Sequence, residues 1–115
     1  MEKVYDLEER TYLFAKSCRS LIKELPKTIS NIQDGKQLVR SSGSVGANYI
    51  EANEKLGDKD LIFRLKIARK EAKEAKYWLR LLKDHNKSFE RDLEKLICEA
   101  DELRKILSAI IYKIQ

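Results

Sequence analysis

The sequence predicts an all-α protein that folds as one domain, residues 1–115, into an antiparallel up-down-up-down four-helix bundle. Charged residues make up 37% of the chain and proline occurs once, a balance that suits long amphipathic helices. Apolar residues recur in steps of three and four along four segments, and no segment alternates as a strand pair does. Short connections should make consecutive helices antiparallel neighbours. The helices are expected at residues 7–24, 30–56, 59–84 and 88–113.

Capping and helix-breaking residues define the ends of these helices. Asp6 can cap the first helix, and Pro26 ends it because proline cannot continue the hydrogen-bond ladder. Ser30 can cap the second helix. Gly57 suits the end of the second helix, and Asp58 suits the N-cap of the third. The candidates for capping the fourth helix are Asn86 and Ser88.

Each helix carries one face of apolar or small residues that should point into the bundle. In the third and fourth helices, steps of three and four residues alternate without interruption, which is the pattern of left-handed bundle packing. The first face consists of Thr11, Phe14, Ala15, Cys18, Leu21, Ile22 and Leu25. The second consists of Gly35, Leu38, Ser42, Val45, Tyr49, Ala52 and Leu56. The third consists of Leu61, Leu65, Ala68, Ala72, Ala75, Leu79 and Leu82. The fourth consists of Phe89, Leu93, Leu96, Ala100, Leu103, Leu107, Ile110 and Ile114.

Small residues are concentrated in the middle of the second helix, over residues 40–52. Two glycines inside a helix should each cost about 1 kcal/mol relative to alanine. Small residues on facing helices can offset this cost, because the backbones approach closely and gain dispersion contacts. We therefore expect a tight helix crossing between the second and third helices. A phosphate-binding turn is the alternative, but no Lys-Ser or Lys-Thr pair follows the glycines and no strand precedes them. The crossing would involve Gly43, Gly46, Ala47, Ala68, Ala72 and Ala75.

Two segments resemble the hallmark segments of a bacterial four-helix-bundle family: residues 40–52 (RSSGSVGANYIEA) and residues 69–82 (RKEAKEAKYWLRLL). Members of this family were first noted as proteins encoded in intervening sequences of 23S ribosomal RNA genes. The resemblance extends to the opening Tyr5-Asp-Leu and to the Leu-Pro-Lys turn at residues 25–27. It implies a small bundle that assembles into a ring-like homopentamer. A more distant relative is the accessory protein of diversity-generating retroelements, a basic pentamer that works with a reverse transcriptase and its RNA. The resemblance brings no catalytic motif.

The net charge of +5 comes mainly from the third helix, where residues 58–85 hold nine basic and five acidic residues. Six cations step by three and four along one side of this helix, over about 26 Å. They could be a solvated face, partly paired with Glu51, Glu54, Glu71 and Glu74. They could also be a track that binds RNA or DNA phosphates by displacing counterions. The six cations are Lys66, Arg69, Lys73, Lys76, Arg80 and Lys83.

The third and fourth helices also carry large apolar residues outside their main faces. Surplus apolar side chains often mark an association surface, where Trp and Tyr are favoured. A broad core face is the alternative. We expect a homo-oligomer whose interface includes Phe63, Ile67, Tyr77, Trp78 and Leu81. The further off-face residues are Ile62, Ile97, Ile106 and Ile111.

Motifs for catalysis or metal binding are not recognisable in the sequence. His85 is the one histidine, so a di-iron bundle with two Glu-x-x-His motifs is excluded. Cys18 lies on the core face, and Cys98 has no histidine near it to act as a base. We therefore expect no enzymatic activity, no metal or other cofactor and no small-molecule substrate. An enzyme with its active site at subunit contacts is one alternative class of function.

The expected location is the cytoplasm. No apolar run approaches the 18 residues of a membrane span, and the N-terminus lacks the apolar core of a signal peptide. The leading hypothesis is a homo-oligomeric scaffold that binds nucleic acid, such as structured RNA or an RNA–protein complex. The alternative is a protein–protein adaptor whose basic row serves only solvation.

Overall fold

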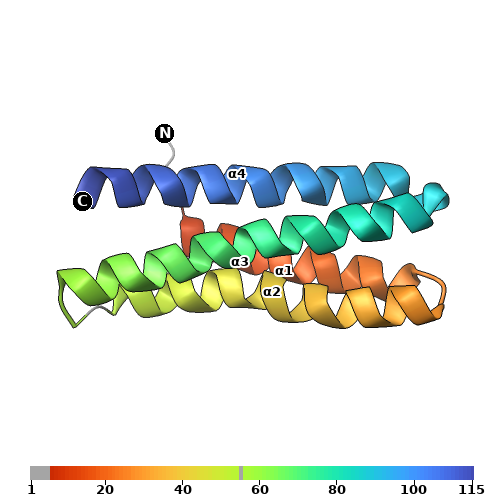
Figure 1. Ribbon diagram of the computed structural model, residues 1–115, viewed down its shortest axis with the longest axis horizontal. Helices are drawn as coiled ribbons and strands as arrows, with labels where there is room; N and C mark the ends of the chain where they lie inside the picture. Colours follow the sequence, from red (N-terminus) through yellow and green to blue (C-terminus); the bar gives the residue numbers. More distant parts are fainter. Residues whose placement is uncertain (1–5, 55) are drawn as a thin grey trace.

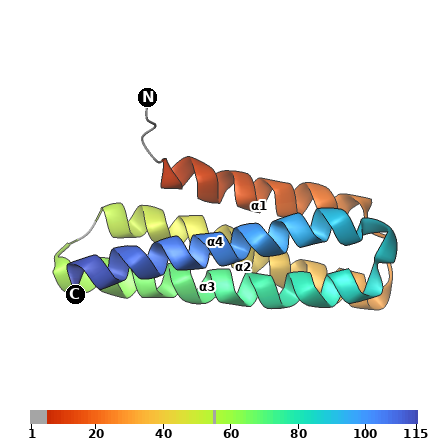
Figure 2. The same ribbon diagram turned by 90° about the horizontal axis from the view of Figure 1, so that it is seen from above.

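The computed structural model describes residues 6–54 and 56–115, so Tyr5 and Lys55 lie outside the described residues. Four long helices and one 3-10 turn make up the fold: α1 (Leu7–Glu24), α2 (Ile29–Asn53), α3 (Asp58–His85), η1 (Lys87–Phe89) and α4 (Glu90–Ile114). The helices run antiparallel in sequence order, and α1 and α3 occupy opposite corners of the bundle (Figures 1 and 2). The all-α four-helix bundle expected from the sequence is confirmed.

The start of α1 is capped as expected, but the start of α2 is not. The Asp6 carboxylate accepts a hydrogen bond from the Glu9 amide at 3.1 Å. The cap of α2 is Thr28 rather than Ser30, and its hydroxyl accepts from the Asn31 amide at 3.1 Å. Thr28 has an extended backbone, which lets its side chain reach back over the first turn. Ser30 already lies inside the helix.

The end of α2 lies three residues before the expected one. The helix ends at Asn53, and Leu56 is 94% exposed instead of continuing the core face. Gly57 has φ +153°, a left-handed conformation that glycine adopts without strain. It directly precedes α3, so Asp58 is the first helical residue rather than the N-cap. The last buried residue of α2 is Ala52, one residue before the end of the helix.

The turn before α4 contains a buried polar contact instead of a helix cap. Neither Asn86 nor Ser88 caps α4, which is preceded by the 3-10 turn. The Asn86 amide exchanges hydrogen bonds with the Asn31 amide, at 2.8 and 2.9 Å. Asn31 also donates to the Pro26 carbonyl, and Asn86 to the Leu82 carbonyl. This asparagine pair ties the α1–α2 turn to the α3–α4 turn at one end of the bundle.

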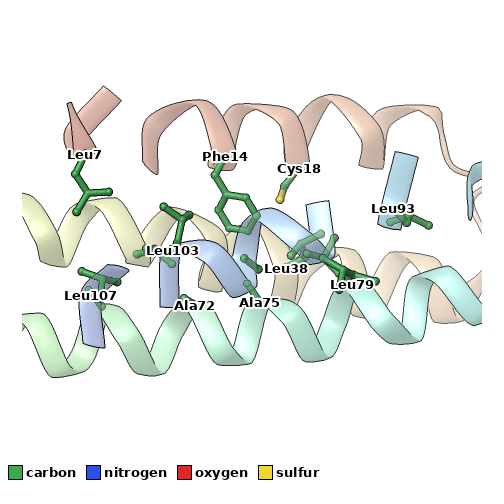
Figure 3. Packing of buried hydrophobic residues seen from close by; sticks show 14 of the residues in the cluster. Leu7, Phe14, Cys18, Leu38, Ala72, Ala75, Leu79, Leu93, Leu103 and Leu107 are labelled. Atoms are coloured by element: carbon green, nitrogen blue, oxygen red, sulfur yellow. The ribbon is translucent and has the colours of Figure 1, made fainter. Parts of the chain in front are cut away.

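The core forms where the four expected faces meet. Phe14 and Cys18 point from α1 into the bundle, toward the side of α3 that carries Ala72 and Ala75 (Figure 3). Leucines from the other helices fill the remaining space, and full burial of each stabilises the fold by about 1.5–3 kcal/mol. Among the described residues, none of the helices has the length and apolar content needed to cross a membrane. The large side chains with almost no exposure include Leu38, Leu65, Leu79, Leu82, Leu93, Leu103 and Leu107.

Candidate nucleic-acid interface

Helices α2 and α3 pack closely along their length, as expected, but the glycines of α2 contact α1 rather than α3. A Cβ at Gly46 would lie 2.8 Å from the Thr11 hydroxyl oxygen and 3.1 Å from Thr11 Cβ, so only glycine fits there. A Cβ at Gly43 would lie 3.0 Å from the Arg19 guanidinium. That guanidinium donates to the Val39 carbonyl at 3.2 Å. The small residues of α2 therefore let α1 approach and let an arginine lie across the helix.

Two parts of the expected crossing need correction. Ala47 is exposed and takes no part in it. The alanines of α3 are fully buried, but they leave room for core side chains such as Phe14 instead of matching the glycines. The reason is the rotation of α2: its buried face points to the bundle centre, and the glycines lie on the α1 side of that face. The alanines concerned are Ala68, Ala72 and Ala75.

The basic row of α3 divides into two parallel stripes. Both stripes step by seven residues, which is two helical turns. The outer stripe (Lys66, Lys73 and Arg80) is exposed to solvent. The inner stripe (Arg69, Lys76 and Lys83) is only partly exposed and contacts α4.

The inner stripe forms a ladder of three contacts with α4. Lys83 Nζ donates to Glu94 Oε1 at 2.7 Å, and Lys76 Nζ donates to Asp101 Oδ1 at 3.2 Å. The third contact is made by Arg69, which donates to the Ser108 hydroxyl at 3.4 Å. The acceptors also step by seven residues, so the ladder follows the antiparallel register of the two helices.

The ladder changes the titration of its carboxylates. The Lys76 ammonium and then the Arg104 guanidinium lower the pKa of Asp101 by donating hydrogen bonds to it. The Lys83 ammonium lowers the pKa of Glu94 in the same way. Both carboxylates are therefore ionised at neutral pH, and each neutralises a cation of the inner stripe. The partner of Arg69 is a neutral hydroxyl, so this contact brings no opposite charge.

The outer stripe keeps its charge. Within residues 6–54 and 56–115, no carboxylate oxygen lies within 4.0 Å of an amino or guanidinium nitrogen of this stripe. The expected acidic partners are used elsewhere: Glu71 and Glu74 both pair with Arg40 of α2. Glu51 is exposed on α2, and Glu54 is exposed at the C-cap of this helix. The pairing expected from the sequence thus joins α2 to α3 and leaves the outer stripe unneutralised.

A third group consists of apolar α3 residues outside the core face of this helix. Phe63 is 58% exposed and Tyr77 is 54% exposed, whereas Ile67, Trp78 and Leu81 are partly buried. Trp78 packs against the core cluster, and its Nε1 donates to Glu74 Oε2 at 3.0 Å. We call these five residues the outer apolar face. The off-face residues Ile97 and Ile111 are buried in the core instead.

Comparison with known proteins identifies the family. Residues 4–109 match the family model described as 23S rRNA-intervening sequence protein. The chain belongs to this family. A crystal structure described as a protein with unknown function from the S23 ribosomal protein family of Bacteroides thetaiotaomicron is 32% identical, with a TM-score of 0.81. The similarity covers 92% of this chain and 98% of that chain. No curated protein matches the chain.

The reactive side chains of this family member are dispersed. Burial raises the pKa of the Cys18 thiol to about 12, so the thiol stays protonated and cannot act as a nucleophile near neutral pH. Cys98 is exposed and lies 3.8 Å from a Glu94 oxygen. His85 is exposed at the end of α3. In the part of the chain that is described, no three His, Cys, Asp or Glu side chains cluster as a metal site would require.

Proposed function

We propose that this protein is a non-enzymatic, self-associating scaffold that binds nucleic acid along the outer basic stripe of α3. The observation that carries the proposal is the separation of the basic row into paired and unpaired cations. Cations already held by carboxylates contribute little to phosphate binding, whereas the outer stripe projects three exposed charges at regular spacing. Unneutralised cations in a line can replace the counterions of RNA or DNA with little sequence preference.

The stripe is long enough to follow a nucleic-acid backbone. Lys66 and Arg80 are separated by about 21 Å along the helix. Arg69 adds a further charge beside them, because its partner Ser108 is neutral. Self-association would place several such stripes on one particle and strengthen binding through simultaneous contacts. RNA, DNA or a nucleic-acid-processing protein carrying RNA are the partners that this surface fits.

The test is binding of RNA and duplex DNA at increasing salt for the variant Lys66→Gln/Lys73→Gln/Arg80→Gln. Loss of three phosphate contacts should reduce the slope of log affinity against log salt by about 2–3. The matched control is Lys16→Gln/Lys23→Gln/Lys36→Gln, which removes three exposed cations from α1 and α2. The control should keep the wild-type slope. Equal losses in both variants would mean that binding depends only on net charge, and no wild-type binding at low salt would refute the proposal.

A specific observation also supports self-association through the outer apolar face. Exposed Phe63 and partly buried Ile67, Trp78 and Leu81 are surplus apolar side chains on α3, and Tyr77 lies at the edge of this group, next to the outer stripe. The homopentamer implied by the family resemblance is the assembly that we favour. Light scattering should give a mass above that of the 13.5 kDa monomer, and Trp78→Glu should return it toward the monomer. A wild-type monomer at high micromolar concentration would refute this part.

The competing function is a protein–protein adaptor that does not contact nucleic acid. The two experiments separate it from our proposal, because an adaptor would still associate but would show no salt-dependent binding of RNA or DNA. Enzymatic activity has less support, since Cys18 is buried and protonated and the Cys98 thiol contacts the Glu94 carboxylate at 3.8 Å. A cytoplasmic location suits a scaffold that acts on RNA.

A further inference from the structure

A shallow groove lies on the α3–α4 seam at the middle contact of the ladder. Four cations, one aromatic ring and one carboxylate line it. Tyr77 is the aromatic residue, and it is half exposed. The lining residues are Lys73, Lys76, Tyr77, Arg80, Asp101 and Arg104.

The position of Tyr77 on α3 sets it apart from the rest of the outer apolar face. It lies four residues after Lys73 and three before Arg80, so these two cations of the outer stripe flank it at one helical turn. Tyr77 therefore borders the basic groove as well as the apolar surface. A ring in this place can contact a ligand that the neighbouring cations hold.

The neighbouring Trp78 ring supports the orientation of the Tyr77 ring. The Tyr77 and Trp78 rings meet edge to face, with centroids 5.0 Å apart and planes at 77°. The Trp78 indole is in turn held by Glu74, which pairs with Arg40 of α2. This chain of contacts restrains the aromatic ring before any ligand binds, which lowers the entropy lost on binding.

We infer that this groove binds unpaired nucleotides, with Tyr77 stacking on a base while Lys73 and Arg80 contact the flanking phosphates. An exposed aromatic ring beside a line of cations is the combination that single-strand binding proteins use. The bases of a duplex are stacked on one another and cannot reach the ring, so a duplex would use the cations alone. The inference rests on the proposed nucleic-acid function and specifies its ligand as single-stranded segments.

The test compares a single-stranded oligouridine RNA with a duplex RNA of the same length, using wild type, Tyr77→Ala, Tyr77→Phe and Tyr12→Ala. Tyr77→Ala should weaken single-strand binding by about ten-fold or more, since one stacked base contributes that much. Tyr77→Phe should keep wild-type binding because the ring remains. Tyr12, 59% exposed on α1, provides the control and should have no effect. Duplex binding and the salt slope should stay within about two-fold in all variants, because the phosphate contacts are unchanged.

The outcomes separate this inference from the proposed function. If wild type binds neither RNA at low salt, both fail. If wild type binds both RNAs and Tyr77→Ala leaves single-strand binding unchanged, or weakens duplex binding equally, the stacking role is wrong while the proposed function stands. The molar mass of each variant should also be measured by light scattering. A loss of mass in Tyr77→Ala would place the ring at a subunit contact and overturn the inference.

Discussion

The α1–α2 and α3–α4 seams differ in the residues that cross them. In the first, glycines let the helices approach closely. Thr11 lies so near Gly46 that a side chain on residue 46 would collide with it, and Arg19 lies across Gly43. In the second, the inner stripe reaches across to α4 through three polar contacts at seven-residue intervals. One seam is closely packed where side chains are absent, and the other is bridged by long charged side chains at the surface.

The difference shows why the two hairpins can serve different purposes. A glycine crossing is sensitive to added volume, because the interior is close-packed and the backbone cannot move without disturbing its neighbours. A surface ladder contributes little stability, since exposed ion pairs are screened by water. Its side chains can therefore carry function as well. Substitutions in the α1–α2 seam are expected to lower the stability of the fold. Substitutions in the α3–α4 ladder are expected to leave stability almost unchanged and to alter nucleic-acid binding instead.

The largest effect should come from Gly46→Leu in the α1–α2 seam. The added side chain would collide with Thr11, and overpacking of this kind should lower the free energy of unfolding by about 3 kcal/mol. Urea denaturation measures the loss. Gly35→Ala is the control, because a Cβ there would lie 3.4 Å from Ile22 Cγ2, an ordinary contact. It should stabilise the helix by up to about 1 kcal/mol. A neutral Gly46→Leu would refute the close crossing.

The next effect concerns the buried asparagine pair that joins the two hairpins. Asn31→Ala removes a donor from the Pro26 carbonyl and leaves the Asn86 amide without its partner. Unsatisfied buried polar groups should cost about 1–3 kcal/mol, again measured by urea denaturation. Asn53→Ala is the matched control, since its amide bonds the exposed Glu8 carboxylate of α1. It should change stability by less than about 0.5 kcal/mol. Equal effects would mean that the pair contributes no more than a surface contact.

Sequence periodicity alone predicted the four helices and most of their buried faces. The three-four steps of α3 and α4 leave little choice of face, and Pro26 and Gly57 mark two of the breaks. The early end of α2 was missed, because Leu56 continues the spacing although no neighbour covers it. A periodic pattern says which residues share a side of a helix. It does not say whether another helix lies over that side.

The candidate site was predicted only in part, for a related reason. The spacing of the six cations showed that they share one side of α3, but their division into two stripes depends on where α4 lies. The partner of the glycines depends in the same way on which neighbour flanks that side of α2. Asn31 and Asn86 are far apart in the chain, and each alone resembles an ordinary turn residue. The division into two stripes, the partner of the glycines and the asparagine pair all depend on how each helix is rotated about its axis. Packing of the whole core sets that rotation.

The smallest structural effect, and the sharpest contrast with Gly46, is expected for Asp101→Asn in the α3–α4 ladder. Its carboxylate lies close to three cations: Lys76, Arg104 and Lys105. The hydrogen bond from Lys76, followed by that from Arg104, lowers the pKa of Asp101, so the group is fully charged at neutral pH. Removing that charge should leave urea denaturation almost unchanged, because the contacts are at the surface.

Nucleic-acid binding should respond in the opposite direction. With Asp101 neutral, Lys76 and Arg104 become available to phosphate, and RNA affinity at low salt should rise about three- to ten-fold. The salt slope should steepen by about 0.7–0.9 for each cation released. The exposed Asp92→Asn of α4 changes the net charge equally but lies outside the ladder, so it serves as the control. Should both variants gain affinity to the same extent, the ladder would have no specific influence on binding. A large loss of stability in Asp101→Asn would instead show that the α3–α4 seam depends on its charges for folding, as the α1–α2 seam depends on its glycines.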